Sequence, residues 1–289
     1  MNEAASRPWR PSPLVIGSAG LHGVALASVL AFPNSWPVMA GALIGNHVVL
    51  STVGMFPRCG WLGPNITRLP AASAQAGVVA LTFDDGPDPA VTPVVLDLLD
   101  QARARATFFC VGRRAEAHPA IVAEIRARGH GVENHTYSHP NGFAFRGLRG
   151  LGREVRQGQA AIERAGGGRP AFFRAPAGIQ NPLVPVALAA AGLTLVSWTR
   201  RGFDTVTGDG ARVAARLCRG LRGGDILLLH DASSAPDGRG RPVVLDALPR
   251  VLETMAGASL RSEALHVALA TQGPRSRPTI REGGRPDTR

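Results

Sequence analysis

The sequence predicts an α/β fold in which a parallel β/α barrel follows an N-terminal pair of apolar helices. Two observations support this prediction. Two uncharged apolar runs lie within the first 56 residues of the 289-residue chain, and further along short apolar runs alternate about seven times with helical patterns. Strands that alternate with helices are typical of a parallel sheet covered by helices. The length suffices for one sizeable α/β domain plus an appendage.

The apolar runs cover residues 14–32 and 36–56. Each is about as long as the roughly 20 residues that cross a bilayer, and their glycines suit the packing of membrane helices. Pro33 and Pro37 mark a turn between them. We therefore predict a transmembrane helical hairpin within residues 1–63. The alternative is a cleaved signal peptide followed by a buried helix, because residues 25–27 (Ala-Leu-Ala) offer a small-residue cleavage pattern.

The charges that flank the hairpin predict its orientation. Arg7 and Arg10 precede the first run, Arg58 and Arg68 follow the second, and the connection between the runs is uncharged. The positive-inside rule then leaves both ends, and the domain that follows, in the cytoplasm. We expect a bacterial inner-membrane protein with this orientation. If only one run spans the membrane, the domain lies outside.

The net charge of +11 comes from arginine alone, and it is spread along the chain. Aromatic residues make up only 5% of the chain and do not alternate with basic ones, so we expect no nucleic-acid partner. Cys59, Cys110 and Cys218 lie far apart without the spacing of a zinc finger, and we interpret them as free or buried thiols.

Residues 64–77 are rich in small side chains and are expected to link the hairpin to an α/β domain over residues 78–270. The Arg-, Pro- and Gly-rich residues 271–289 are expected to be disordered. A helix is expected to start at Thr92-Pro93, where Thr can cap and Pro suits the first turn. The expected strands are 78–83, 106–111, 130–134, 171–174, 193–198, 225–230 and 266–270. The other expected helices are 119–128, 148–165, 182–191, 209–221 and 242–255.

In a parallel barrel, catalytic side chains lie at the C-terminal ends of the strands. The first expected strand ends in Asp84 and Asp85, followed by Gly86 and Pro87. Neighbouring residues of an extended segment point in different directions, so one carboxylate can bind a metal while the other faces a water molecule. The alternative is an ordinary turn, for which Asp, Gly and Pro are the common residues.

The third expected strand leads into His135 and His139. Histidines at positions i and i+4 share a face if the segment is helical. Two histidines and one carboxylate would leave coordination positions open for water and substrate, as in catalytic metal sites. Together with the two aspartates, the pair therefore predicts a catalytic metal site.

Three further strands end in candidate residues. Arg174 can orient a neighbouring carboxylate or be a loop arginine. Trp198 can line a substrate pocket, or it can simply fill space at the open end of the barrel. His230 is well placed for proton transfer, although a lone histidine is more often structural. Arg200 and Arg201 could meet an anionic substrate group, but a solvated loop charge is slightly favoured.

These motifs, in this order, resemble the signatures of the polysaccharide deacetylase family, the NodB-homology group also called carbohydrate esterase family four. The matching segments are residues 82–87, 135–139, 174–178 and 228–230, and the resemblance covers roughly residues 78–270. It implies a distorted (β/α)7-type barrel. It also implies one divalent metal ion, which we expect to be zinc, with cobalt, nickel and manganese as alternatives.

The resemblance also implies a role for each site residue. The metal ligands are Asp85, His135 and His139. The catalytic residues are Asp84 as the general base, Arg174 as the residue that orients it, and His230 as the general acid. The residues implied to border the substrate are Trp198, Leu228, Ala177 and Asp204, with a backbone N–H near Ala177 helping to hold the oxyanion.

The chain departs from the family pattern at two positions. Ala177 stands where an aromatic residue is frequent. Asp204 follows Trp198 by six residues, whereas the family often has an acidic residue close behind this tryptophan. Either Asp204 or Asp231 could therefore tune His230.

The leading functional hypothesis is a hydrolase that removes N-acetyl groups from the amino sugars of a glycan. An alternative is a deformylase or amidase that acts on a lipid-linked sugar or another non-peptide C–N bond. An inactive membrane scaffold is disfavoured, because every expected metal and acid/base position is filled. The expected partners are a glycan or lipid-linked sugar and, through the hairpin, the membrane.

Overall fold

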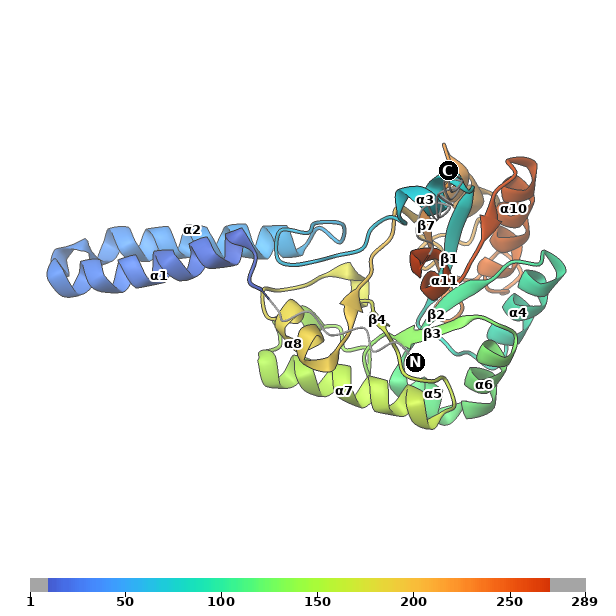
Figure 1. Ribbon diagram of the computed structural model, residues 1–289, viewed down its shortest axis with the longest axis horizontal. Coiled ribbons are helices and arrows are strands. Elements are labelled where there is room, and N and C mark those ends of the chain that lie inside the picture. The colour runs from blue at the N-terminus through green and yellow to red at the C-terminus, as the bar shows by residue number, and fades with distance from the viewer. Residues whose placement is uncertain (1–9, 271–289) are drawn as a thin grey trace, which may run out of the picture.

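An apolar helical hairpin projects from an α/β domain in the computed structural model, which describes residues 10–270 (Figure 1). The hairpin consists of α1 (Pro13–Ala31), the short 3-10 helix η1 (Pro33–Ser35) and α2 (Trp36–Gly54). Both long helices are apolar and long enough to cross a membrane, and little of either is buried within the protein. The terminal residues 271–289, which we expected to be disordered, lie outside the described residues.

Polar contacts join the two helices of the hairpin. The Asn46 amide donates a hydrogen bond of 2.8 Å to the Ser18 hydroxyl, and the rings of His22 and His47 meet edge to face at 5.3 Å. Hydrogen bonds between polar side chains stabilise helix pairs in an apolar environment. The hairpin is therefore held by specific contacts as well as by its short connection.

The α/β domain is built on one parallel sheet whose strand order is β5-β4-β3-β2-β1-β7-β6, with β8 paired to the start of β1. Among the described residues no ladder joins β5 to β6, so the sheet curls into an incomplete barrel. This confirms the predicted fold class. The strands are β1 (Val78–Asp84), β2 (Ala106–Cys110), β3 (Gly131–Asn134), β4 (Phe172–Phe173), β5 (Thr194–Leu195), β6 (Arg200–Arg201), β7 (Ile226–His230) and β8 (Arg261–Ser262).

Helices pack around the sheet (Figure 1). Successive residues of a strand point to opposite faces, which explains the two cores at the centre of the sheet. Leu81 and Leu227 belong to the core beneath the outer helices, whereas Ala80 and Leu228 belong to the core inside the curl. The helices of the domain are α3 (Ala71–Gln75), α4 (Thr92–Gln101), α5 (Gly112–Ala117), α6 (Pro119–Ala127), α7 (Leu148–Arg164), α8 (Val184–Ala191), α9 (Gly210–Cys218), α10 (Val244–Gly257) and α11 (Leu265–Ala270).

The structure corrects several predicted elements. Residues 266–270 form most of α11 instead of a strand, and the last strand is β8. Helix α11 follows β8 after only two residues, and its apolar Leu265 and Ala268 pack inside the curl, so a short apolar run looked like a buried strand. β6 was not predicted, because it is only two residues long and both are arginines.

Thr92 does not cap α4 as we expected. It is the first helical residue, and Val91 occupies the cap position without a side-chain hydrogen bond. The Thr92 hydroxyl instead donates a hydrogen bond of 2.6 Å to Asp231 and accepts one from the Asp88 N–H. This threonine therefore joins the start of α4 to the segment that follows β7.

Residues 64–77, which we expected to be a linker, make specific contacts with the barrel. Ile66 forms a β-bridge with Val196, and the Leu69 N–H donates a hydrogen bond to the Gly224 carbonyl. Ser73, on α3, donates a hydrogen bond to the Ala268 carbonyl. The segment that connects the hairpin to the domain is thus packed against the barrel.

Candidate active site

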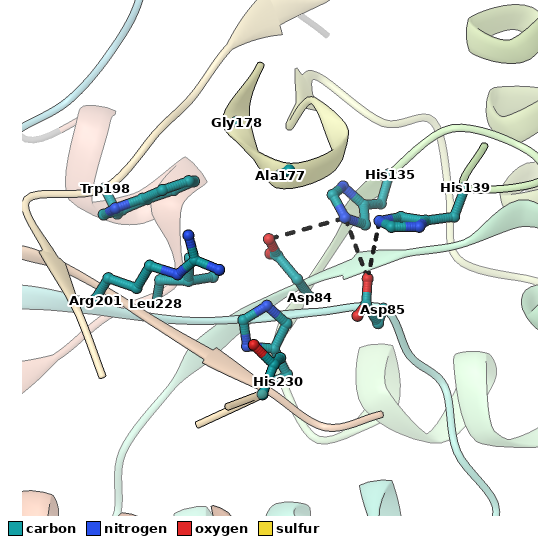
Figure 2. Close-up of a pocket in the computed structure, with 11 residues that line it drawn as sticks. Asp84, Asp85, His135, His139, Ala177, Gly178, Trp198, Arg201, Leu228 and His230 are labelled. Atoms are coloured by element: carbon teal, nitrogen blue, oxygen red, sulfur yellow. Dashed lines mark ion pairs between the residues drawn. The ribbon is translucent and has the colours of Figure 1, made fainter. Parts of the chain in front are cut away.

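The predicted site residues converge at the C-terminal ends of the strands, around a pocket of about 170 Å³ (Figure 2). Pocket residues that were also predicted from the sequence are Asp84, Asp85, His135, His139, Ala177, Trp198, Leu228 and His230. The other two predicted residues, Arg174 and Asp204, are fully buried and do not line the pocket. Arg174 is hydrogen-bonded to Asp84, and Asp204 is hydrogen-bonded to His230.

Asp85, His135 and His139 form a compact cluster. The Asp85 Oδ1 atom lies 3.4 Å from His135 Nε2 and 3.3 Å from His139 Nε2, and one ligand atom from each residue lies within 4.8 Å of the others. Ligands placed tetrahedrally at 2.0–2.2 Å from an ion are separated by about 3.3–3.6 Å. Their spacing therefore fits a tetrahedral divalent metal.

A backbone contact fixes which nitrogen of His135 faces this cluster. The His135 Nδ1 lies 2.8 Å from the Arg174 carbonyl oxygen, so Nδ1 carries the proton and donates it to that oxygen. The lone pair of Nε2 is then directed toward Asp85. Metal-binding histidines are commonly oriented by such a second hydrogen bond.

The segment from His135 to His139 is a loop, and our helical explanation for the pair is wrong. Thr136 and His139 have φ values of 67° and 50°, in the left-handed region. The Asn134 side chain accepts a hydrogen bond from the Thr136 N–H, and Glu154 on α7 accepts bonds from the N–H and hydroxyl of Ser138. These contacts hold a turn that brings both imidazoles to Asp85.

Asp85 also departs from the extended strand, with a φ of 74°. Burial raises the pKa of Asp85, but the hydrogen bond to His135 and the charges of His135, His230 and His139 outweigh it. The net effect is a pKa below the ordinary value. Asp85 is therefore ionised at neutral pH, as a metal ligand requires.

Asp84 lies on the face of β1 that points into the curl, two residues after Thr82. The Arg174 Nη1 donates hydrogen bonds of 2.7 Å to Asp84 Oδ1 and 2.8 Å to the Thr82 hydroxyl. The other carboxylate oxygen, Oδ2, lies 3.9 Å from His135 Nε2. Arg174 thus orients Asp84 so that one oxygen remains directed toward the cluster of Asp85, His135 and His139, which we call the metal-type cluster (Figure 2).

His230 is the residue of β7 that pairs in register with Asp84 of β1, so the two side chains share the pocket. Asp204 accepts hydrogen bonds from His230 Nδ1, at 2.9 Å, and from the His230 backbone N–H, at 2.7 Å. Burial lowers the pKa of His230, but the hydrogen bond and charge of Asp204, with the charges of Asp84 and Asp85, outweigh it. The net shift raises the pKa of His230 above its ordinary value.

The sequence left the partner of His230 open between Asp204 and Asp231, and the structure selects Asp204. Asp231 instead accepts the hydrogen bond from Thr92, and burial raises its pKa to about 7. Asp204 is fully buried and does not line the pocket, so its position is behind His230 and not among residues that border a substrate.

Ala177 has a φ of 55°, and its backbone N–H has no acceptor among the described residues. It lines the pocket on the same side as the two histidines (Figure 2), where an N–H can stabilise negative charge.

The next residue, Gly178, is required by packing, since a Cβ there would lie 2.6 Å from Pro57 and from the Trp198 ring. Sequence reasoning named neither Gly178 nor Thr205, another lining residue, as a site residue, because neither side chain has a chemical signature.

A family model described as polysaccharide deacetylase matches residues 71–196 of the chain. A chitooligosaccharide deacetylase of Sinorhizobium fredii is 38% identical over 174 residues, which span 57% of this chain and 77% of the relative. A peptidoglycan-N-acetylglucosamine deacetylase of Bacillus cereus is 34% identical over 61% of this chain and 80% of the relative. The family 4 carbohydrate esterase from Streptomyces lividans, solved in complex with acetate, superposes with a TM-score of 0.60 at 33% identity. That match covers 68% of this chain and 98% of the esterase.

We predict that the His135→Ala variant loses its divalent ion, because the remaining Asp85 and His139 provide only two of the three ligands. Metal content of the purified full-length protein, measured by mass spectrometry after incubation with zinc and desalting, checks this. The His266→Ala variant is a matched control, since His266 is exposed on α11. An unchanged ion content in His135→Ala would refute the ligand set.

Proposed function

The chain belongs to the polysaccharide deacetylase family, and we propose that it is a metal-dependent hydrolase that removes N-acetyl groups from the amino sugars of a glycan. The observation that carries this proposal is the convergence of three metal-type ligands, an oriented carboxylate and an aspartate-paired histidine on one pocket. That set contains the groups needed to activate water, stabilise an oxyanion and protonate a leaving nitrogen.

Asp85, His135 and His139 are the residues that would hold the ion, and we propose zinc as the metal. A bound divalent ion would polarise the acyl carbonyl and lower the pKa of a coordinated water. The donor set supports this proposal, since two imidazoles and one carboxylate are common ligands of catalytic zinc.

Asp84 is proposed as the general base that accepts the proton of the attacking water. Its Oδ1 atom is held by Arg174, and its Oδ2 atom is directed toward the metal-type cluster. Orientation matters for this role, because a general base must lie within hydrogen-bond reach of the proton that it removes. Arg174 is proposed to act through Asp84, as a positioning residue.

His230 is proposed as the general acid that protonates the leaving sugar nitrogen, and its protonated form is stabilised by Asp204. The Ala177 N–H is proposed to donate a hydrogen bond to the oxyanion as the carbonyl carbon becomes tetrahedral. Trp198 and Leu228 line the pocket with apolar surface. This surface suits the methyl of an acetyl group.

The hairpin is proposed to anchor the enzyme in the bacterial inner membrane. α1 and α2 carry no charged residue, and their apolar side chains are mostly exposed. Their flanking arginines favour a cytoplasmic location for the active site.

The direct test of the proposed function is the release of acetate from a panel of N-acetylated amino sugars by the full-length, zinc-supplemented protein. We predict that Asp84→Asn lowers turnover by about 10²–10⁴-fold while the ion stays bound, because Asp84 is not among the ligands. Asp97→Asn is the control, since the Asp97 carboxylate is 60% exposed and pairs with Arg128 on the surface. Near-normal activity of Asp84→Asn would exclude this aspartate as the base.

We predict that Asp204→Asn shifts the alkaline limit of activity to lower pH. The acid must be protonated, and its activity is lost as the pH rises through the pKa of His230. Removing the negative charge of Asp204 lowers the pKa of His230, so activity is lost at a lower pH. The measurement is kcat/KM for acetate release against pH, and an alkaline limb that does not move would contradict the role of the pair.

We predict that a cytoplasm-active reporter fused after the α/β domain is functional and that a periplasm-active reporter at the same place is not. This follows if both helices cross the membrane. The reverse result would mean that the active site faces away from the cytoplasm and would contradict the proposed orientation.

A further inference from the structure

Arg201 lies on the pocket side of the sheet. It pairs in register with Leu228, the inward-facing residue of β7 that also lines the pocket. Figure 2 shows its guanidinium beside Trp198 and Leu228, directed toward Asp84. The Arg201 Cζ atom lies 5.6 Å from the centre of the Trp198 ring and 4.9 Å from that of Phe203. The pocket thus contains a cation in addition to the proposed catalytic groups.

No anionic side chain in the part of the chain that the structure describes pairs with this cation. Within residues 10–270, the side chain of Arg201 forms no hydrogen bond or ion pair, and its Nε atom is buried without an acceptor. The neighbouring Arg200, on the other face of β6, pairs with Asp225. A solvated loop charge, the interpretation that the sequence slightly favoured, therefore does not describe Arg201.

An unpaired, partly buried guanidinium is costly unless a ligand supplies the missing acceptor. The two carboxylates of the pocket already have partners, since Asp84 is bound by Arg174 and Asp85 contacts His135 and His139. A guanidinium presents a planar fork of hydrogen-bond donors, which is suited to phosphate and carboxylate groups.

The chain that follows the hairpin packs directly against the wall of this pocket. Pro57 accepts a hydrogen bond of 2.6 Å from the Ser197 hydroxyl, and the Gly54 carbonyl, at the end of α2, accepts one of 3.0 Å from the Gln180 N–H. The Arg58 side chain donates to the Thr199 carbonyl at 3.1 Å. These contacts involve the segments that carry Gly178 and Trp198, so the pocket is fixed close to the end of α2.

Large apolar side chains surround this junction. Met55, Phe56 and Trp61 are 66%, 62% and 66% exposed, respectively. Aromatic residues at the end of a membrane helix commonly lie at the level of the lipid headgroups. With α1 and α2 in the bilayer, the pocket then lies at the membrane surface.

We propose that the substrate is an N-acylated amino sugar joined through a phosphate to a membrane lipid, and that Arg201 binds this phosphate. The proposal rests on the proposed function and names its substrate class. Two independent observations carry it: the unpaired guanidinium in the pocket and the contacts that fix the pocket against the end of the hairpin. Arg201 is a substrate-selecting residue in this scheme, and the cleavage chemistry belongs to the metal-type cluster, Asp84 and His230.

The test compares acetate release from four N-acetylglucosamine derivatives by the full-length protein in lipid nanodiscs with added zinc. They are a polyprenyl-phosphate-linked sugar, an uncharged alkyl glycoside, soluble N-acetylglucosamine 1-phosphate and soluble chitotriose. We expect kcat/KM to be highest for the lipid-linked phosphate. The Arg201→Gln variant should lose about 10- to 100-fold on it and little on the uncharged alkyl glycoside, and Arg201→Lys should recover part of the loss.

Arg216→Gln is the matched control, because Arg216 also stacks on Phe203 but does not line the pocket; it should behave like the wild type. A second measurement that does not depend on turnover is calorimetric binding of N-acetylglucosamine 1-phosphate, which should weaken in Arg201→Gln and not in Arg216→Gln.

Each outcome bears on the proposal. Equal losses on charged and uncharged substrates, or no loss, would overturn the role of Arg201. Equal rates on the soluble and lipid-linked phosphates would overturn the membrane-bound substrate. Failure to release acetate from any of the four compounds would instead contradict the proposed function.

Discussion

The buried ion pair between Arg174 and Asp84 is the interaction on which the rest of the site depends. Arg174 is fully buried, stacks on the Phe109 ring at 4.1 Å and donates hydrogen bonds to the carbonyls of Val196 and Ser197. It thereby joins β1, the end of β4 and the segment after β5. Removing one partner of such a pair leaves an uncompensated buried charge, which costs about 3–5 kcal/mol. The same contact therefore stabilises the barrel and orients the proposed base.

Around this pair, several site residues adopt backbone conformations that residues other than glycine usually avoid. Asp85, Thr136, His139 and Ala177 all have positive φ values, each of which costs of the order of 1–3 kcal/mol for a residue other than glycine. Surrounding contacts hold these conformations, notably those of Glu154 with the loop between the two histidines. The ligands can converge because α7 and the strands position their loops.

The hairpin and the pocket are structurally continuous. The chain after α2 contacts both loops that form one wall of the pocket, and the packing between Pro57, Gly178 and Trp198 leaves no room for a larger residue than glycine. A hairpin that only tethered the domain would need no such contacts. The position of the pocket relative to the hairpin is thus a property of the fold.

The sequence by itself determined the α/β class, the two apolar helices and the motifs at Asp84-Asp85 and His135–His139, because apolar runs and motif spacing are local in the chain. Only the tertiary structure decided what depends on strand register and packing between distant segments. It chose Asp204 over Asp231 as the partner of His230, and it showed α11 where a strand was expected. It also separated Arg201, which faces the pocket with Leu228, from Arg200, which faces the other side with Asp225. Adjacent residues of a strand point in opposite directions, and which of the two faces the pocket is fixed by the neighbouring strand.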